Sequence, residues 1–540
     1  MSLHIEYVDA PVGAQEAAEP FAYNTQSFGK ASQIAAGAND TPWVSLETNG
    51  WSLNGKGLLI PENAQDIGWW SGERSGEDGR FANPPEIDIY FPGKSYTATG
   101  ITFRFWPSLE DWCSEMIVQW YKDGNHVDSV QVYPDSANWI LQHSVDDFDQ
   151  INIQIMATNK PGQYAKIQQI QVGQVVFFMH NEIVSVSLLT EIDPSLCELS
   201  ADAMTIEIRD IGKRKIIPQK SQTMHLYQNG VQIAAHYVDD FSRESAGVYR
   251  FECTSAIGQL EDDYLGGVYS EKPLTSVLSG LLSGFEYSID ESFANAKITG
   301  YLPACTRREA LQQISFAIGA VVKTGETGTI RLLPPEEVVT GAIENDRIFT
   351  GAKVKQNAPI VSVQVVSHSY TPNEETETLL ENEHIGEVDV LYVFSEPHHS
   401  YELTGQEATL DSYGENWVRI SAPETVTLTA KKYTHSSVVH TKKNQVSTNA
   451  QKGQVITVDS ATLINSQNVT DAMDRLHEYY MNDQLLTEDI VVNGEHAGDK
   501  VSSSSPWGNK IVGYITKMES TFTGNGHRSS IQVSGTEVAE

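Results

Sequence analysis

Short runs in which apolar and polar residues alternate recur through most of the chain, and this period of two constrains the fold more than any other feature. In residues 1–178 the runs are EIDIYF, ITFRFW, MIVQWY, DSVQVY and INIQIM, each bounded by Gly, Pro, Asn or Asp. A period of two places successive side chains on opposite faces of a β-strand. We therefore predict an N-terminal β-sandwich or jelly roll over residues 1–178.

Two dipeptides, Asp123-Gly124 and Asn229-Gly230, predict tight β-hairpins. Both central positions of a type I′ turn need positive φ, which Asp, Asn and Gly tolerate best. The second dipeptide lies in residues 181–256, where NEIVSVSLLTEID, MTIEIRD and AGVYRFECTS are typical of further strands. We expect a small antiparallel barrel over this block.

Residues 257–342 mix helix with strand and predict a small α/β domain. Thr306 and Glu309 have the spacing of a capping box, which starts a helix that we expect to end near Gly319. A hairpin follows in AVVKTGETGTIRLLP. The expected apolar face of the helix consists of Ala310, Leu311, Ile314, Ala317, Ile318 and Val321.

Residues 346–540 return to β-structure. They include one amphipathic helix, in NVTDAMDRLHEYYMND, and a closing hairpin around Gly-Asn-Gly. The acidic run PNEETETLLENEH predicts a solvated loop. The strand-like runs after it indicate an inserted β-subdomain over about residues 372–460. The whole chain is thus expected to be mainly β and multidomain.

The charge balance argues against a protein that holds nucleic acid. The 540 residues carry a net charge of −35, whereas phosphate binding needs a basic face. An acidic surface keeps a protein soluble, or it forms a wall past which DNA slides without binding. The start of the chain lacks the pattern of a signal peptide, and no run reaches 18 apolar residues. We expect cytoplasmic synthesis, no membrane span and no stable nucleic-acid binding.

No motif in the chain predicts catalysis, a metal or a cofactor. Cys305 precedes a helix but has no neighbouring histidine, and Arg307 and Arg308 are better read as facing solvent or a partner than as catalytic. His398 and His399 are adjacent, so on a strand they point to opposite faces and make a poor metal-binding pair. A hidden carboxylate pair would be the one route to a glycoside hydrolase.

Tryptophans in the first block are the best hint of a ligand. Exposed aromatic rings stack on sugar faces, although most indoles in a β-sandwich lie in its core. Two of them are adjacent on one strand and cannot both face a single core. The candidates for carbohydrate binding are Trp69, Trp70, Trp106, Trp112 and Trp139.

The segment GYLPACTRREALQQISFAIGAVVKTGETGTIRLLPP resembles tail proteins of phages and prophages of Gram-positive bacteria. NEIVSVSLLTEIDPSLCELSADAMTIEIRD is similar to the start of their hub domain, and NVTDAMDRLHEYYMNDQLLTEDIVVNGEHAGDKV with IVGYITKMESTFTGNGHRSSIQVSG is similar to its end. The likeness covers about residues 181–540. WYKDGNHVDSVQVYPDS and QYAKIQQIQVG resemble an N-terminal jelly roll of some of these proteins.

This resemblance implies a structural baseplate hub or tail tip protein and no enzyme. Such hubs are homotrimers in which each chain supplies two tube-type β-barrels, so that three chains match a sixfold tail tube to a threefold spike or fibre. The implied partners are other copies of the chain, the tail tube, the spike or fibre and other baseplate proteins. The implied location is the tail of a virion or of a phage-tail-like particle, including contractile injection systems, assembled in the host cytoplasm.

A repeated run of four letters bears on the two barrels. IVSV opens the block at residue 183 and occurs again at residue 360. We expect the two runs to start equivalent barrel strands within the trimer. The strand residues concerned are Ile183, Val184, Val186, Ile360, Val361 and Val363. The alternative function is recognition of a host carbohydrate, with a cell-wall glycan as partner, and the third is a cell-wall hydrolase.

Overall fold

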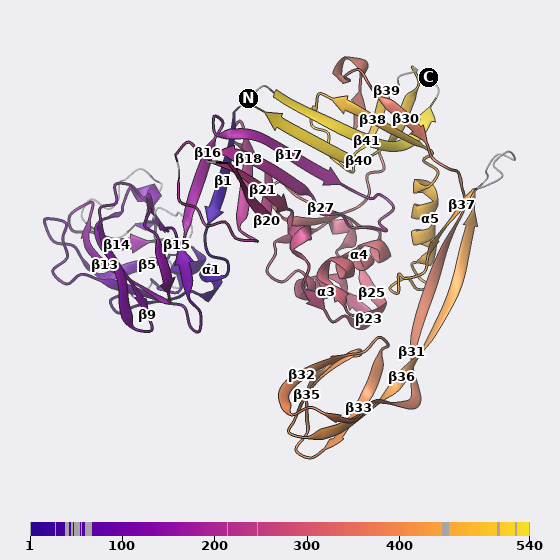
Figure 1. The fold of residues 1–540 in the computed structure, drawn as a ribbon, viewed down its shortest axis with the longest axis horizontal. Coiled ribbons are helices and arrows are strands. Elements are labelled where there is room, and N and C mark those ends of the chain that lie inside the picture. Colours follow the sequence, from indigo (N-terminus) through magenta and orange to yellow (C-terminus); the bar gives the residue numbers. More distant parts are fainter. Residues whose placement is uncertain are drawn as a thin grey trace.

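The computed structural model describes residues 2–538 except 27–28, 38–42, 45–46, 48–54, 56, 60–66, 213, 246, 445–452, 505–507 and 524–525. Strands make up most of the described chain and form several bodies around one large sheet (Figure 1). The expected mainly β, multidomain architecture is therefore confirmed. In the described part of the chain, no helix is long and apolar enough to span a membrane.

A 13-stranded sheet, here called the central sheet, forms the middle of the molecule. One half comes from residues 3–254 and the other from residues 341–538. In order across the sheet, the strands are β16 (Gln174–Met179), β1 (Leu3–Asp9), β19 (Thr223–Gln228), β20 (Val231–Ser245), β21 (Val248–Thr254), β18 (Ala203–Arg209), β17 (Ile183–Glu191), β40 (Lys510–Thr523), β41 (Gly526–Val538), β38 (Gln484–Ile490) and β30 (Lys353–Gln356), with β39 (Lys500–Ser504) on β40 and β29 (Gly341–Ile343) on β39.

The two halves meet where β17 pairs antiparallel with β40, with Val186 opposite Phe522. We call this pairing the seam. Two separate closed barrels were expected, and within the described residues the strands instead join in one open sheet. The seam explains the difference, because it occupies the strand edges that each half would need to close on itself.

The N-terminal domain is inserted between two strands of the central sheet. Strands β1 and β16 pair with each other there, so the sheets do not divide at the expected boundary of residue 178.

A five-stranded antiparallel sheet packs with smaller sheets around one apolar core, as expected for a β-sandwich. Its strands are β10 (Asn125–Val132), β9 (Cys113–Lys122), β13 (Gln150–Thr158), β6 (Glu86–Tyr90) and β2 (Glu19–Ala22). The smaller sheets contain β11 (Asn138–Leu141), β8 (Ile101–Arg104), β15 (Gln169–Val172), β14 (Tyr164–Ile167), β5 (Trp69–Arg74), β12 (Val145–Phe148), β7 (Tyr96–Ala98), β3 (Trp43–Val44) and β4 (Leu58–Leu59), with the short helices α1 (Ala14–Ala17) and α2 (Gln33–Ala36).

Both predicted tight turns are confirmed. Asp123 and Gly124 have φ of 49° and 75° between β9 and β10, and Asn229 and Gly230 have φ of 52° and 82° between β19 and β20. Positive φ at both central positions is the geometry that selects these residue types. The dipeptides therefore fixed the register of two hairpins.

The α/β domain lies beneath the central sheet (Figure 1). Helix α4 (Arg307–Ile318) starts at the predicted capping box of Thr306 and Glu309 and ends at Gly319, which has a φ of 78°. Its buried face packs with helices α3 (Leu274–Leu281) and α5 (Val469–Tyr479) in the largest apolar core. The strands here are β22 (Asp263–Tyr264), β23 (Gly267–Pro273), β24 (Tyr287–Ile289), β25 (Lys297–Leu302), β26 (Cys305–Thr306), β27 (Val321–Thr324) and β28 (Ile330–Leu333).

A long, narrow β-sheet, here called the arm, projects from the body and ends in a small tip (Figure 1). The acidic run 372–384 was expected to be a loop, and it is instead the outer half of a 25-residue strand. One face of this outer half packs into a small apolar core through Leu379 and Leu380, while Glu374, Glu375 and Glu381 stay exposed to solvent. The insertion therefore begins near residue 360 rather than 372. The arm comprises β31 (Ile360–His384), β36 (Thr425–Lys443), β37 (Gln454–Val458) and β33 (His398–Gly405), and the tip adds β32 (Glu387–Val393), β34 (Thr409–Tyr413) and β35 (Trp417–Ala422).

The expected equivalence of the two IVSV runs is wrong. The first run starts β17 inside the central sheet, while the second starts β31, which pairs with β36 and β37 in a separate four-stranded sheet. Both strands have neighbours on both sides in these segments, so neither offers an edge to another copy. Val186 and Val363 are fully buried in different cores, whereas Val184 is 37% exposed.

Candidate functional site

One face of the central sheet is polar and open, and we call it the polar face. Ser185 and Ser187 on β17 lie opposite Thr523 and Thr521 on β40. Ser187 Oγ donates a hydrogen bond to Glu519 Oε1 at 3.3 Å, which places both side chains on this face. Residues in between point the other way, into apolar cores. The period of two in the sequence therefore separates a wet surface from a buried one across the seam.

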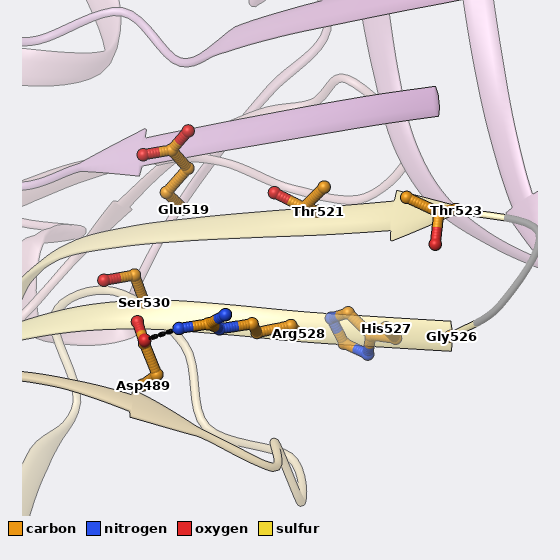
Figure 2. A pocket seen from close by; sticks show the side chains of 8 residues that line it. All are labelled: Asp489, Glu519, Thr521, Thr523, Gly526, His527, Arg528 and Ser530. Carbon is orange, nitrogen blue, oxygen red and sulfur yellow. Dashed lines mark hydrogen bonds and ion pairs between the residues drawn. The ribbon is translucent and has the colours of Figure 1, made fainter. Parts of the chain in front are cut away.

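A shallow hollow of about 540 Å³ lies on this face over β38, β40 and β41 (Figure 2). Arg528 crosses it and forms an ion pair with Asp489. The other side chains are mostly short hydroxyls, which leave the backbone of the sheet close to the surface. The lining comprises Asp489, Glu519, Thr521, Thr523, Gly526, His527, Arg528 and Ser530.

Three basic groups on the polar face, Lys517, Arg250 and Arg528, pair with acids, whereas Arg209 on β18 is exposed and forms no ion pair among the described residues. Lys517 Nζ lies 2.5 Å from a Glu191 carboxylate oxygen, and Arg250 Nε lies 3.1 Å from one of Glu252. Glu207 on β18 lies opposite Ser185 on β17 and Arg250 on β21, and it forms no ion pair in the described structure. Acids thus outweigh free cations here, which disfavours retention of a phosphate backbone.

A second, deeper space of about 390 Å³ lies between the buried side of the central sheet, the α/β domain and the loop before β39, and we call it the joint. His236 lines it, is 4% exposed, and neither ring nitrogen has a hydrogen-bond partner in the described structure. Burial lowers the pKa of His236 to about 4 and raises the pKa of Asp202 to about 7. Lys323 lies 3.9 Å from Asp499 across the same space, and burial lowers the pKa of Lys323.

No sequence pattern singled out the joint. Its residues come from strands of both halves of the central sheet, from β27 and β28 of the α/β domain and from loops, and they meet only once the blocks have docked. Each polar residue taken alone resembles an ordinary strand or loop residue. A histidine or an aspartate flanked by apolar residues was the one available signal, and it is common in ordinary cores.

The tryptophan candidates for sugar stacking are mostly buried. Trp69 faces the sandwich core, whereas Trp70 faces a second cluster with Trp106, and all three have no exposed surface. The adjacent pair thus serves two cores on opposite sides of β5, and the accessible platform expected there is wrong. Trp112 and Trp139 are half-buried and pack against the sandwich core.

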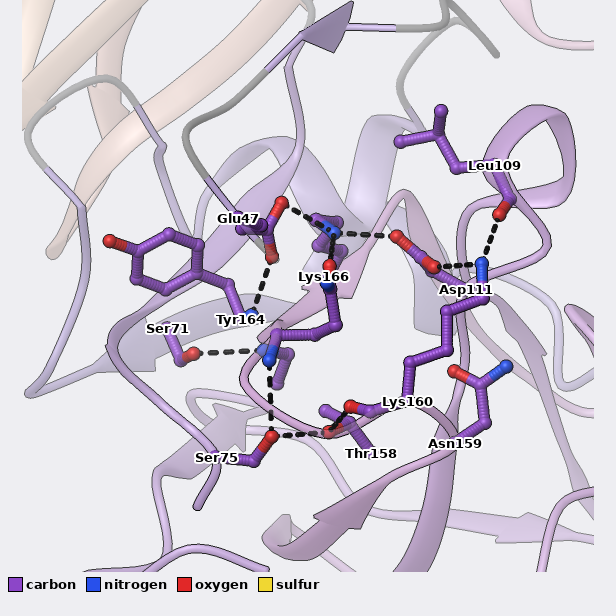
Figure 3. Close-up of polar contacts among 12 residues, drawn as sticks. Glu47, Ser71, Ser75, Leu109, Asp111, Thr158, Asn159, Lys160, Tyr164 and Lys166 are labelled. Atoms are coloured by element: carbon purple, nitrogen blue, oxygen red, sulfur yellow. Dashed lines mark hydrogen bonds and ion pairs between the residues drawn. The ribbon is translucent and has the colours of Figure 1, made fainter. Parts of the chain in front are cut away.

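A buried ion cluster forms around Lys166 (Figure 3). Lys166 Nζ lies 2.9 Å from Glu47, 2.5 Å from Asp111 and 4.9 Å from the centre of a Trp70 ring. Lys160 also binds Asp111, at 2.7 Å. This cluster occupies the space that a sugar ring would need beside Trp70.

Arg307 is not partner-facing, contrary to expectation. Its guanidinium donates to the carbonyl oxygens of Leu281 at 2.5 Å and Ser283 at 2.6 Å, just past the end of α3, and lies 5.4 Å from the centre of the Phe285 ring. It caps a helix C-terminus inside the domain. Arg308 is half-buried, and its backbone N–H donates a hydrogen bond to the carbonyl oxygen of Leu260.

The thiol and histidine candidates show ordinary structural roles. Burial raises the pKa of Cys305 to about 12, so the group is a neutral thiol at physiological pH. His398 lies 3.3 Å from Glu377, and His399 contacts the carbonyl oxygen of Asn373. Among the described residues, no group of three His, Cys, Asp or Glu side chains is placed to hold a metal ion.

Comparisons with known proteins give weak structural likenesses. No family model and no curated protein matches the chain. The prophage MuSo2 43 kDa tail protein from Shewanella oneidensis is 8% identical, with a TM-score of 0.39, over 67% of this chain and 95% of that one. Prophage tail protein gp18 from Listeria monocytogenes is 10% identical, with a TM-score of 0.39, over 66% and 91%. A family 32 CBM from C. perfringens NanJ, solved with galactose, is 14% identical, with a TM-score of 0.19, over 32% and 98%. At these scores the likenesses carry no argument about function.

Proposed function

We propose that the chain is a structural hub at the distal end of a phage tail or phage-tail-like particle, where it acts as a homotrimer that matches a sixfold tube to a threefold spike or fibre. The observation that carries this proposal is the seam, which joins strands more than 300 residues apart into one wide sheet with a single polar, acidic face. Three such sheets around an axis would enclose a channel lined by that face. DNA would pass such a wall without binding to it.

The sequence resemblance of residues 181–540 to tail hub proteins supports the same reading. The described residues also lack the marks of an enzyme site at the expected positions, because the thiols are neutral and Arg307 binds backbone carbonyl oxygens inside its own domain. The chain would then act through the surfaces that it presents to other subunits and proteins. The proposed tail tube, spike and other baseplate partners would contact the ends of this channel.

Subunit contacts are proposed at the outer edge of the central sheet. Strand β16 ends the sheet, and it carries Phe177 and Met179, which are 45% and 55% exposed. An edge strand offers unpaired backbone groups, and exposed apolar side chains beside it mark a contact surface. At the opposite edge, the short β30 itself carries Lys353 and Lys355, which disfavour pairing with other strands.

The test is the mass of the purified full chain by mass photometry. A trimer has three times the monomer mass of 59.6 kDa. The double variant Phe177→Glu/Met179→Glu should shift the population to monomer, while Val388→Glu, an equally drastic change at an 81% exposed site on the tip, should not. A wild-type protein that stays monomeric at high concentration, alone and with a tube or spike partner, contradicts the proposal.

A further inference from the structure

A cleft of about 600 Å³ separates the arm from the α/β domain, and we call it the arm cleft. Its walls are β23 and β25 on one side and the β31–β36 ribbon on the other, and the loop before α5 closes one end (Figure 1). This volume lies in the range of small-molecule sites, which runs from about 300 to 1,000 Å³. Gly300 forms part of the wall with φ of 136°, and a Cβ there would lie 2.7 Å from the carbonyl oxygen of Thr462.

Among the described residues, the lining contains no Asp, Glu, Lys or Arg, although 20% of the chain is charged. It consists mainly of hydroxyl, amide and aromatic side chains. Such a lining gives no fixed counter-charge for a phosphate, a carboxylate or a cation, and it therefore favours a neutral ligand. The residues are Val268, Tyr269, Ser270, Thr299, Gly300, Ser367, His368, Ser369, Tyr370, Pro372, Tyr433, Ser436, Val438, Asn465, Ser466 and Gln467.

Two tyrosine rings in the cleft are held in place by their neighbours. Tyr370 stacks on His435 with centroids 4.6 Å apart and also contacts Tyr301 at 5.2 Å. Tyr433 packs edge-on against His399 at 5.2 Å. Burial raises the pKa of Tyr370 to about 12, so its hydroxyl stays protonated and able to donate. Rings fixed before binding lose little entropy when a ligand arrives.

Polar groups on the rim are free to bind. In the described structure the side chains of Ser270, Ser466 and Gln467 make no hydrogen bond within the protein and are exposed. Hydroxyl and amide groups both donate and accept, which suits a partner that offers many hydroxyls. A pyranose ring has such hydroxyls around its edge and an apolar C–H face that packs on an aromatic ring.

From this lining we infer that the arm cleft binds a neutral oligosaccharide. The inference does not rest on the trimer, because every residue of the cleft comes from one chain. It also places ligand binding beside the arm rather than at the buried tryptophans of the N-terminal domain. A surface glycan of a target cell is one source of such a ligand.

The test uses the full-length protein with chitotriose, cellotriose and galactobiose as probes. Binding is measured by saturation-transfer NMR and isothermal titration calorimetry. At least one probe should bind the wild type with a Kd of about 1 mM or tighter. Tyr433→Ala removes one ring and should weaken that binding about tenfold or more, and Gln467→Ala, at an exposed loop position, should weaken it without disturbing the fold.

Tyr413→Ala is the matched control, because Tyr413 is 61% exposed on the tip and lies outside the cleft. It should leave the Kd unchanged. The inference is overturned if the wild type binds none of the three probes, if both cleft variants bind as the wild type does, or if the control loses binding to the same degree. Each of these results can occur with the protein trimeric or monomeric, so a failure here is distinct from a failure of the proposed assembly.

Discussion

Replacing His236 by leucine should change how the stability of the joint depends on pH. His236 is 4% exposed and has no hydrogen-bond partner in the described structure, so its neutral form is the one that the folded protein accepts. Burial lowers its pKa from 6.5 to about 4. The leucine side chain fills a similar apolar volume and has no titratable group.

The magnitude follows from proton linkage. Above the unfolded pKa of 6.5 the side chain is neutral in both states and adds no pH dependence. As the pH falls from 6.5 to the folded pKa of about 4, His236 binds a proton in the unfolded chain but not in the folded chain. The free energy of unfolding therefore decreases. At about 1.4 kcal/mol per pKa unit, this loss is about 3 kcal/mol.

Asp202, in the same joint, acts in the opposite direction. Its pKa is raised from 3.8 to about 7, so its contribution is fully present below 3.8 and is lost as the pH rises through 7. In the wild type the two effects largely cancel between pH 4 and 6.5. The His236→Leu variant should therefore gain stability relative to the wild type on acidification, and Asp202→Asn should lose it.

The assay is urea unfolding read by pulsed hydrogen exchange and mass spectrometry on peptides that cover β20, because a multidomain chain need not unfold in one step. The difference in unfolding free energy between variant and wild type should change by about 2–3 kcal/mol between about pH 7.5 and about pH 4.5. A difference that stays constant over this interval would refute the assignment of a buried, neutral histidine.

Three further changes follow from contacts in the other bodies. Thr306→Ala removes the helix cap of α4 and should lower the stability of the α/β domain by about 1 kcal/mol in urea unfolding, with Thr306→Ser restoring most of it. Lys166→Met leaves Asp111 and Glu47 buried without their shared cation, so thermal unfolding followed by tryptophan fluorescence should show a loss of about 3–5 kcal/mol, against almost none for Lys220→Met at an exposed pair. Gly300→Val should detach the arm base from the α/β domain, seen as faster hydrogen exchange in residues 462–468, because the new side chain meets the carbonyl of Thr462.

Local features could be predicted from the sequence where interactions between near neighbours in the chain determine them. The turns at Asp123 and Asn229 and the start of α4 at Thr306 depend only on backbone sterics and on hydrogen bonds between near neighbours. Each is where the residue types predict it. The alternating runs likewise gave the strands and their buried faces.

Long-range pairing was not readable in the same way. β17 could pair with many strands of suitable alternation, and nothing local selects β40, which lies over 300 residues away. The acidic stretch of β31 looked like a loop because its charges indicate a hydrated segment, and a strand with one face exposed to solvent is hydrated as well. Trp70 looked exposed because the second core on the far side of β5 is assembled from distant residues, including Trp106 and Lys166.

Electron cryo-microscopy of the purified full-length protein, alone and with its tube or spike partner, tests the proposed assembly most directly. We predict a ring with threefold symmetry and a central channel, in which the polar face around Thr521 lines the channel and β16 lies at a contact between subunits. A monomer under every condition would contradict the account, and so would a ring whose channel is lined by the arm or by the N-terminal domain.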